Sequence, residues 1–409
     1  MAGFPQVMTA AVPGVGEMHY LVDENFDFIP EVKRFLNYKR SVGRAPNTIL
    51  AYCSRLRYFY RFLYQKGRSV LPMAGSKQAD SADLVEFLIW LCNPHRDAGN
   101  VDVIYQSSPV QASTVNHILQ AVGSLYKYLV RHKELAESPV KYVDVPRGQM
   151  LKDLDLLTHT RRGRDAATVQ KMELKLKEPK RIPKVVEDPD FAAYVDSIHM
   201  GSRPQTDPAG FRDRLICVLL KESGLRIGEL LGMRLEDIEH GKGGIHVRFR
   251  GDNANKARAK TGYGRDRFVD LPPDVMGMLD IYLTEVWLDA SPDHDYLWVV
   301  LRQNARNHDG VVTYGHPLNY KAVSSQFKHY SEQSGVHVTP HKLRHTHATS
   351  LVRSFSDHGQ PVDWKFIQER LGHASVVTTM MTYTHLNDKD RKKGYDSYLE
   401  RKEKSRASR

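Results

Sequence analysis

The stretch HKLRHTHATS, residues 341–350, holds three histidines and an arginine within seven positions, and it follows the residues VTP. On a helix, His341 and His345 stand at i and i+4, the separation at which two imidazoles bind one zinc ion in the H-E-x-x-H helix. That motif requires a glutamate after the first histidine, but Lys342 occupies the position. Because a lysine there repels a dication, the zinc interpretation is the weaker one.

The same stretch fits the start of an anion-binding helix. Thr339 can cap the helix, and Pro340 can take the first helical position, where its missing N–H is not needed. His341 then lies in the first turn, and Arg344 follows on the same face beside free backbone N–H groups and the positive end of the helix dipole. This arrangement predicts a phosphate site. His347, by contrast, is expected to pack in the core.

The composition favours a polyanionic partner. The 409 residues carry a net charge of +11 with 41% apolar residues, so the chain can bury two cores and remain basic. No G-x-x-x-x-G-K-[ST] segment occurs, so ATP hydrolysis is not indicated.

Sequence features also bear on the compartment. Cysteines 53, 92 and 217 are odd in number and lack C-x-x-C spacing, which predicts reduced thiols. No apolar run approaches the ~18 residues of a membrane span, and the N-terminus lacks signal-peptide character. We therefore expect a cytoplasmic protein without a membrane contact.

The first half of the chain predicts a helical domain. Residues 1–24 lack periodicity and are expected to form a flexible leader, whereas residues 25–140 contain four helical patterns. Residues 141–185 lose the pattern and accumulate positive charge, which predicts a basic interdomain linker.

Positive side chains recur on the helices and the linker, and one sign of charge dominates. A positively charged helix face is either a solvated surface or a contact to DNA phosphates, and the clustering of lysine and arginine favours DNA. The candidate DNA-binding residues are Arg44, Thr48, Arg55, Arg57, Arg61, Lys127, Arg161, Arg162 and Arg164.

The second half predicts a mixed domain over residues 186–387. Two helical runs are separated at Gly224, the segments GGIHVRFR (243–250) and RDRFVDLP (265–272) read as strands, and helical patterns follow to about residue 386. The fold class is therefore mostly α with a small β-sheet, with an α+β second domain. Residues 388–409 form a basic C-terminal tail.

Four local motifs now stand in one order along the chain. They are GLRIGELL with Arg226, HKLRHT with His341 and Arg344, LGH with His373, and TYTH with Tyr383, and Lys260 lies between the two strands. Together they resemble the R…K…H-x-x-R…H…Y signature of the tyrosine recombinase (phage integrase) family. The segments NTILAY and STVNHILQAVGSLYKYL resemble the helical core-binding domain of that family, so residues 186–387 are expected to be its catalytic domain.

The resemblance implies a role for each signature residue. Tyr383 would attack the scissile phosphate and form a 3′-phosphotyrosine, with His341 as the base. Lys260 would protonate the leaving 5′ oxygen. The remaining residues would hold the phosphate or its ligands: Arg226, Arg344 and His373 bind it, and Glu229 supports the arginines.

The lysine assignment stays open, because the strand connection is long and Lys256 competes with Lys260. The KTG context favours Lys260. The resemblance implies no cofactor, no metal ligand and no ATP requirement, since the covalent bond conserves the energy of the cleaved linkage.

The expected partners are double-stranded DNA recombination sites and further copies of the chain. The resemblance implies a tetramer on two duplexes, in which the tail docks on a neighbouring subunit, with accessory or directionality factors as further partners. It also implies integration or excision of a mobile element. Two alternatives remain: a catalytically inactive DNA-binding regulator on the same scaffold, and a tail that is only a solvated basic segment.

Overall fold

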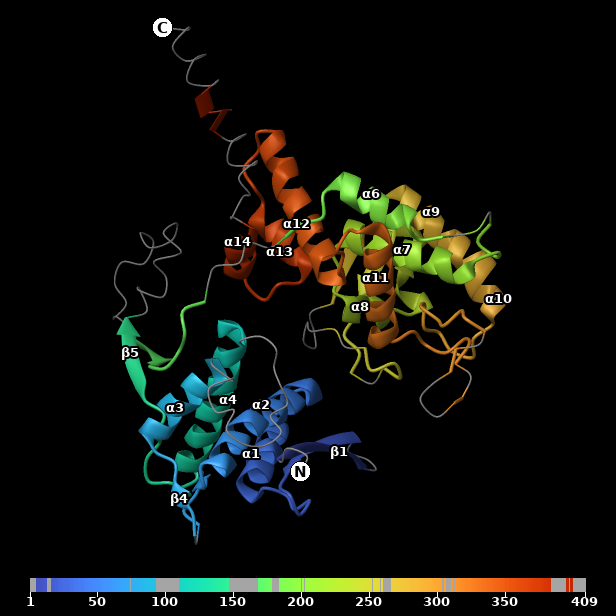
Figure 1. The fold of residues 1–409 in the computed structure, drawn as a ribbon. Helices are drawn as coiled ribbons and strands as arrows, with labels where there is room; N and C mark the ends of the chain where they lie inside the picture. The colour runs from blue at the N-terminus through green and yellow to red at the C-terminus, as the bar shows by residue number, and fades with distance from the viewer. Residues whose placement is uncertain are drawn as a thin grey trace, which may run out of the picture. The chain divides into compact units, whose positions relative to one another are not determined.

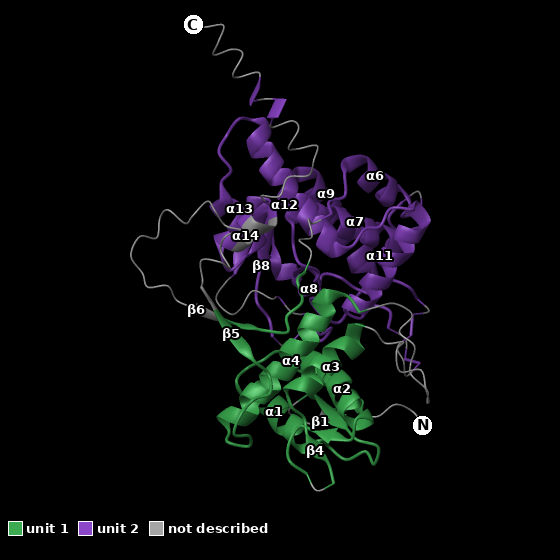
Figure 2. Cartoon of the chain, turned by 60° about the vertical axis from the view of Figure 1, so that its left-hand side comes forward, with its two compact units in different colours: residues 1–180 green, residues 181–409 purple. Residues whose placement is uncertain are grey.

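The computed structural model describes residues 5–12, 16–73, 75–92, 110–146, 168–178, 184–199, 201, 203–251, 253–257, 259, 266–303, 305–306, 310–311, 313–383, 395–396 and 398–399. The chain divides into two compact units, Met1–Lys180 and Arg181–Arg409 (Figure 2). The boundary falls near the end of the segment predicted as a linker. Among the described residues, no helix is both long and apolar enough to cross a membrane.

The first unit contains the four predicted helices (Figure 1). They are α1 (Pro30–Ser41), α2 (Pro46–Gln65), α3 (Ser81–Cys92) and α4 (Ala112–Arg131). Prolines begin α1 and α2, where the absent N–H costs no hydrogen bond. The apolar stripes meet in one core, in which the Phe59 ring lies edge-on to the rings of Phe87 and Tyr126. The prediction of a helical domain is confirmed.

The flexible leader predicted for residues 1–24 is wrong over most of its length. Strands β1 (Gln6–Val12) and β2 (Gly16–Val22) pair as an antiparallel hairpin. Leu21 and Val22 are each 1% exposed, and the Ile29 N–H donates to the Leu21 carbonyl oxygen. The strand pairing satisfies the backbone polar groups while the end of β2 is buried, and composition alone did not reveal this.

The linker prediction also needs correction, because its two ends form an ordered pair of strands. Strand β5 (Tyr142–Pro146) pairs antiparallel with β6 (Thr168–Met172). A Cβ at Gly123 in α4 would lie 2.6 Å from the Met172 methyl carbon, so the end of the Met172 side chain packs directly over this glycine. Asn116 of α4 fixes the segment after β6. Its side chain donates to the Leu176 carbonyl oxygen at 2.9 Å and accepts from the Leu176 N–H at 2.8 Å.

A second short pair in this unit is parallel, between β3 (Arg68–Ser69) and β4 (Lys77–Gln78). The three cysteines are free; Cys53 and Cys217 are buried and Cys92 is partly buried.

The second unit is the predicted mixed domain. Its helices are α6 (Asp188–Asp196), α7 (Pro208–Ser223), α8 (Ile227–Leu231), α9 (Pro273–Tyr282), α10 (Leu288–Ala290), α11 (Tyr320–Ser334), α12 (Pro340–Asp357), α13 (Trp364–Leu371) and α14 (Val376–Tyr383). Short helical turns are η2 (Leu235–Asp237), η3 (His240–Lys242) and the π-turn η4 (Leu283–Trp287). The prediction of an α+β domain is confirmed.

The sheet of this unit holds three strands, one more than the sequence predicted. The order is β7 (Ile238–Glu239), β8 (Gly244–Val247) and β9 (Arg267–Asp270), with both pairs antiparallel. Strand β7 has only two residues, too few for an alternating pattern to show. The core beside the sheet includes Trp298, Leu279 and Val269, all fully buried.

Little of the predicted tail lies within the described residues. Tyr395, Tyr398 and Leu399 are 62%, 55% and 38% exposed, and the two tyrosine rings stack 6.2 Å apart. These apolar side chains of the tail therefore face solvent in the single chain.

Candidate active site

The site begins at the sharp turn between α7 and α8. Helix α7 ends at Ser223 and is capped by Gly224, whose backbone is left-handed with φ +65°. A Cβ at this position would lie 2.6 Å from the ring of His347 and 3.1 Å from Leu371, so only glycine fits. The turn places Arg226 directly before α8, as the sequence predicted. His347 is buried, which agrees with its expected place in the core.

Glu229 joins two arginines beneath the site. Its carboxylate is buried and accepts from Arg226 Nη1 at 2.9 Å and from Arg267 Nη2 at 2.8 Å. Burial raises the pKa of Glu229, but the hydrogen bonds and charges of Arg267 and Arg226 outweigh it and leave the pKa lowered. Sequence reasoning found Glu229 and missed Arg267, whose only signal was a cation at an inward position of a strand.

Arg344 is the most enclosed cation of the site, with 3% exposure. Its Nη1 donates to the Gly224 carbonyl oxygen at 2.7 Å, and its Nη2 donates to the Leu371 carbonyl oxygen at 2.6 Å. Burial and the charge of Arg226 lower its pKa to about 10, which still leaves it cationic at neutral pH. Helix α12 starts as predicted, with Thr339 accepting from the Lys342 N–H at 3.2 Å.

The turn after α13 is held by both arginines. The Leu371 carbonyl oxygen also accepts from Arg226 Nη1 at 3.4 Å, and the Gly372 carbonyl oxygen accepts from Arg226 Nη2 at 3.3 Å. Backbone carbonyls thus orient both guanidinium groups and bring His373 beside them. Its Nδ1 lies 2.8 Å from Thr379 Oγ1, and burial, followed by the charges of Arg344 and Arg226, lowers its pKa to about 4.

Tyr383 ends α14 and reaches into this cluster within its own chain. The side chain is 5% exposed, and its ring lies parallel to the His373 ring with centroids 6.4 Å apart. Burial raises the pKa of the phenol to about 12, although the charges of Arg344 and Arg226 act to lower it. The phenol is therefore protonated at neutral pH and needs a proton acceptor before it can act as a nucleophile.

The nearest acceptor is a residue that sequence reasoning considered only as a zinc ligand. Tyr383 Oη lies 3.0 Å from His345 Nδ1, and His345 Nε2 lies 2.9 Å from His341 Nε2. The i, i+4 spacing of the two histidines was the signal, but it was read as metal-ligand spacing. Within the described part of the chain, no group of three or more histidine, cysteine or acidic side chains is arranged to hold a metal ion.

The assembled residues agree with the comparisons to known proteins. Residues 197–390 match the Phage integrase family, and residues 32–133 match the Phage integrase N-terminal SAM-like domain. Transposase A from transposon Tn554 of Staphylococcus aureus is 34% identical over 390 residues, covering 94% of this chain and 95% of that protein. The chain belongs to the phage integrase family of tyrosine recombinases.

Other relatives of this recombinase share its fold. Tyrosine recombinase XerA of Pyrococcus furiosus is 30% identical over 220 residues, 54% of this chain and 63% of that protein. The integrase of transposon Tn1549, solved in complex with a circular intermediate DNA, has a TM-score of 0.55 at 15% identity and covers 90% of this chain and 99% of that chain. XerH, solved in a post-cleavage complex with a palindromic difH substrate, has a TM-score of 0.55 at 16% identity. The match covers 90% of this chain and 95% of the XerH chain.

The connection between β8 and β9 carries both lysine candidates of the recombinase. Lys260 lies outside the described residues, and Lys256 is exposed with a backbone φ of +58°. Asn255 fixes the connection by donating to the carbonyl oxygens of Leu231 and Leu318 at 2.8 and 2.9 Å. The choice between the lysines stays a prediction.

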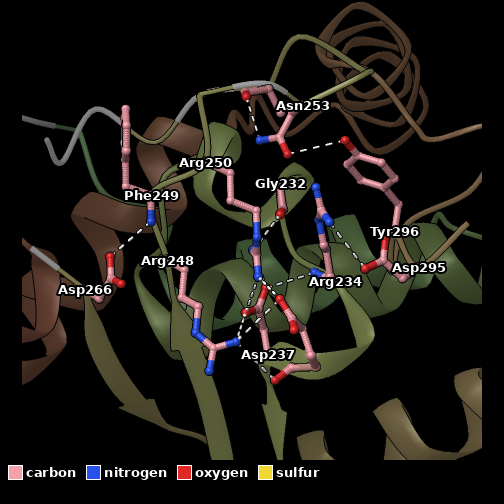
Figure 3. Close-up of polar contacts among 12 residues, drawn as sticks. Gly232, Arg234, Asp237, Arg248, Phe249, Arg250, Asn253, Asp266, Asp295 and Tyr296 are labelled. Carbon is pink, nitrogen blue, oxygen red and sulfur yellow. Dashed lines mark hydrogen bonds and ion pairs between the residues drawn. The ribbon is translucent and has the colours of Figure 1, made fainter. Parts of the chain in front are cut away.

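Figure 3 shows how the start of this connection is anchored. The buried Asp237 carboxylate accepts from Arg250 Nη1 at 2.7 Å and from Arg248 Nη1 at 3.0 Å. Further along, the Tyr296 hydroxyl accepts from the Ala254 N–H at 2.8 Å. This network holds the residues that follow β8, and sequence reasoning did not identify it.

The candidate DNA-binding residues of the first unit do not share one surface. Arg44, Thr48 and Lys127 are exposed, whereas Arg55, Arg57 and Arg61 are half-buried. Because residues two apart on a helix point to different sides, Arg55 and Arg57 of α2 cannot face one surface. Lys127 Nζ lies 3.6 Å from the centre of the Tyr142 ring, so β5 partly occupies it. Arg161, Arg162 and Arg164 lie outside the described residues.

Proposed function

We propose that this recombinase cleaves and rejoins DNA through a 3′-phosphotyrosine at Tyr383 in order to move a transposon-like mobile element. The observation that carries this proposal is the hydrogen bond between the Tyr383 phenol and an imidazole beside two oriented arginines. Similarity to Transposase A from transposon Tn554 over 94% of the chain supports a transposition role rather than another recombination reaction.

Arg226 and Arg344 bind the scissile phosphate. Attack on a phosphodiester concentrates negative charge on its nonbridging oxygens, and donors oriented beforehand stabilise that charge without reorganising. Backbone carbonyl oxygens hold both guanidinium groups, Glu229 also holds Arg226, and the Arg226 side chain keeps 24% exposure. Loss of one such donor is expected to raise the barrier by about 3 kcal/mol.

The remaining roles concern protons and orientation. His341 is the eventual proton acceptor, and His373 donates a hydrogen bond to the phosphate. Lys260 protonates the 5′ oxygen as it leaves, with Lys256 as the alternative. Since the arginines supply the charge stabilisation, the reaction needs neither a metal ion nor ATP.

The partners in this proposal are two DNA sites and four copies of the chain. Structures of similar proteins are solved with DNA, including a lambda integrase dimer on a COC′ core site. We infer that the first unit contributes DNA contacts through Arg44, Thr48 and Arg55, and that the tail docks on a neighbouring protomer. Three free thiols agree with action in the reducing cytoplasm. Accessory or directionality factors are further expected partners.

The competing proposal is a DNA-binding regulator that retains the scaffold without catalysis. The two proposals differ in one product, a covalent protein–DNA adduct with a free 5′ hydroxyl. The test is to express the protein beside its element, sequence the recombined junctions, and incubate the purified protein with a nicked duplex of the junction sequence in EDTA. An adduct that resists denaturant supports the recombinase, whereas site binding without an adduct supports the regulator.

A further inference from the structure

His345 stands between the nucleophile and the histidine of the H-x-x-R motif. The two nitrogens of its ring make both contacts: Nδ1 lies 3.0 Å from Tyr383 Oη, and Nε2 lies 2.9 Å from His341 Nε2. The His345 and His341 rings meet edge-on with centroids 4.3 Å apart. A proton that leaves Tyr383 in this arrangement therefore encounters His345 before His341.

The contacts restrict where the protons lie. For the Tyr383 hydroxyl to donate to His345 Nδ1, the neutral imidazole must carry its own proton on Nε2. Only one proton fits between two nitrogens in contact, so His345 Nε2 donates and His341 Nε2 accepts. Burial, followed by the charges of His341 and Arg344, lowers the pKa of His345 to about 4, which keeps it neutral and able to accept.

We propose that His345 is the base that takes the proton from Tyr383, and that it passes its other proton to His341. The inference rests on the proposed role of Tyr383 as the nucleophile. The Oη–H bond breaks as a bond to His345 Nδ1 forms, and the Nε2–H bond of His345 breaks as a bond to His341 Nε2 forms. The phenolate oxygen then bonds to phosphorus, and the bond to the 5′ oxygen breaks with a proton from Lys260.

This transfer preserves both hydrogen bonds of the relay, the one between Tyr383 and His345 and the one between His345 and His341. Afterwards His345 carries its proton on Nδ1 and donates to the phenolate oxygen, while the His341 imidazolium donates to His345 Nε2. The positive charge resides on His341, which is exposed, and not on the enclosed His345. Rejoining runs the same path backwards and returns the proton to Tyr383.

The ionisable groups around His345 come from three elements. They are His341 and Arg344 on α12, Tyr383 on α14, and His373 after α13. His373, whose pKa is also lowered to about 4, is neutral at pH 7 and so does not supply a competing proton to Nδ1.

The first test reads the tautomers in the full-length free protein. Long-range proton–nitrogen NMR of the protein with ¹⁵N-labelled histidine, assigned with His345→Gln and His341→Gln, should show His345 protonated on Nε2 and unprotonated on Nδ1 at pH 7. A His345 ring protonated on Nδ1 at that pH would overturn the proposal, because it could not accept from the phenol.

The second test measures cleavage of a nicked duplex carrying the mapped junction sequence. His345→Asn keeps an oxygen near the Nδ1 position but cannot take up a proton, so DNA binding should persist while adduct formation slows about 100-fold at pH 7. Its rate should rise about tenfold per pH unit as hydroxide replaces the base. If His345 only packed, the substitution would lower the rate of adduct formation by the same factor at every pH. A His345→Asn profile parallel to that of the wild type would therefore contradict the proposal.

The control separates this inference from the function on which it rests. If Tyr383→Phe abolishes the adduct while His345→Asn cleaves at the wild-type rate, the nucleophile stands and His345 is not the base. If Tyr383→Phe still forms the adduct, the nucleophile itself is misassigned and the relay falls with it.

Discussion

The Arg344 guanidinium donates to the carbonyl oxygen of Gly224 over 2.7 Å, which ties helix α12 to the turn between α7 and α8. The turn that carries Arg226 therefore also orients Arg344, the second arginine proposed to bind phosphate. The geometry of the site therefore depends on a backbone turn as much as on its catalytic side chains.

Arg344→Lys should reduce cleavage strongly while preserving the positive charge. Lysine has no planar fork, so it cannot satisfy two carbonyl oxygens and bind phosphate together. We expect adduct formation to fall about 10²- to 10³-fold, as for loss of an oxyanion-hole donor. Single-turnover cleavage measures this, and a mobility-shift titration serves as the control for DNA binding. A variant that cleaves within a few-fold of wild type would show that charge alone is sufficient.

Glu229→Gln should destabilise the protein in a pH-dependent manner. The pKa of Glu229 is lowered in the folded protein, so its ionised form contributes stability above the ordinary carboxyl pKa of about 4.5. This contribution is lost as the pH falls through the folded pKa, so the difference from Glu229→Gln should shrink below pH 4.5. Urea unfolding of both proteins across pH 3 to 8 tests this prediction; a difference that stays constant would show that the charge is not responsible.

Gly224→Ala should be destabilising beyond the cost of its backbone conformation. A methyl group there meets the buried His347 ring at 2.6 Å, in addition to the strain of a positive φ. Gly243→Ala is a matched control, because Gly243 has φ +67° and a methyl group there would meet nothing within 4 Å. We expect Gly243→Ala to lower the free energy of unfolding by about 1–2 kcal/mol, the cost of the left-handed backbone. Gly224→Ala should lower it by about 1–3 kcal/mol more, the usual cost of overpacking. Equal losses in chemical denaturation would remove the steric part of the explanation.

Lys260→Ala should slow cleavage far more than Lys256→Ala. The acid assists departure of the 5′ oxygen, so a substrate with a 5′-bridging sulfur, whose thiolate leaves without a proton, should restore the Lys260 variant. The rates of the two variants on oxygen and sulfur substrates measure this directly. Rescue of the Lys256 variant instead would assign the role to Lys256.

The sequence predicted the site more completely than the periphery. Arg226, Glu229, Arg344, His373 and Tyr383 were found because each lies in a short local motif, and the structure brings them together. Arg267 was missed because its partners Glu229 and Arg370 lie 38 and 103 residues away in sequence. The Asp237 network was missed because no local motif pairs Asp237 with Arg248 and Arg250, which follow 11 and 13 residues later. The hairpin at residues 6–22 was missed because its glycine, proline and small residues resemble a loop in composition, although each strand has seven residues.

The contact between His345 and Tyr383 could not be predicted from the spacing of the histidines. The sequence showed two imidazoles on one helix face, and that spacing serves a metal site or a proton relay equally well. Only the 3.0 Å approach of Tyr383, which comes 38 residues later, distinguishes the two. Sequence spacing defines which side chains share a face, while tertiary packing decides what they contact.

Tyr383→Phe tests whether Tyr383 forms the covalent bond to DNA. The substitution removes the hydroxyl and keeps the ring, so packing against His373 and DNA binding should persist. Incubated in EDTA with a nicked duplex of the junction sequence, the wild-type protein should form a denaturant-resistant adduct whose modified peptide contains Tyr383. The variant should bind the same duplex and form none. An adduct of undiminished yield in Tyr383→Phe would show that another residue is the nucleophile.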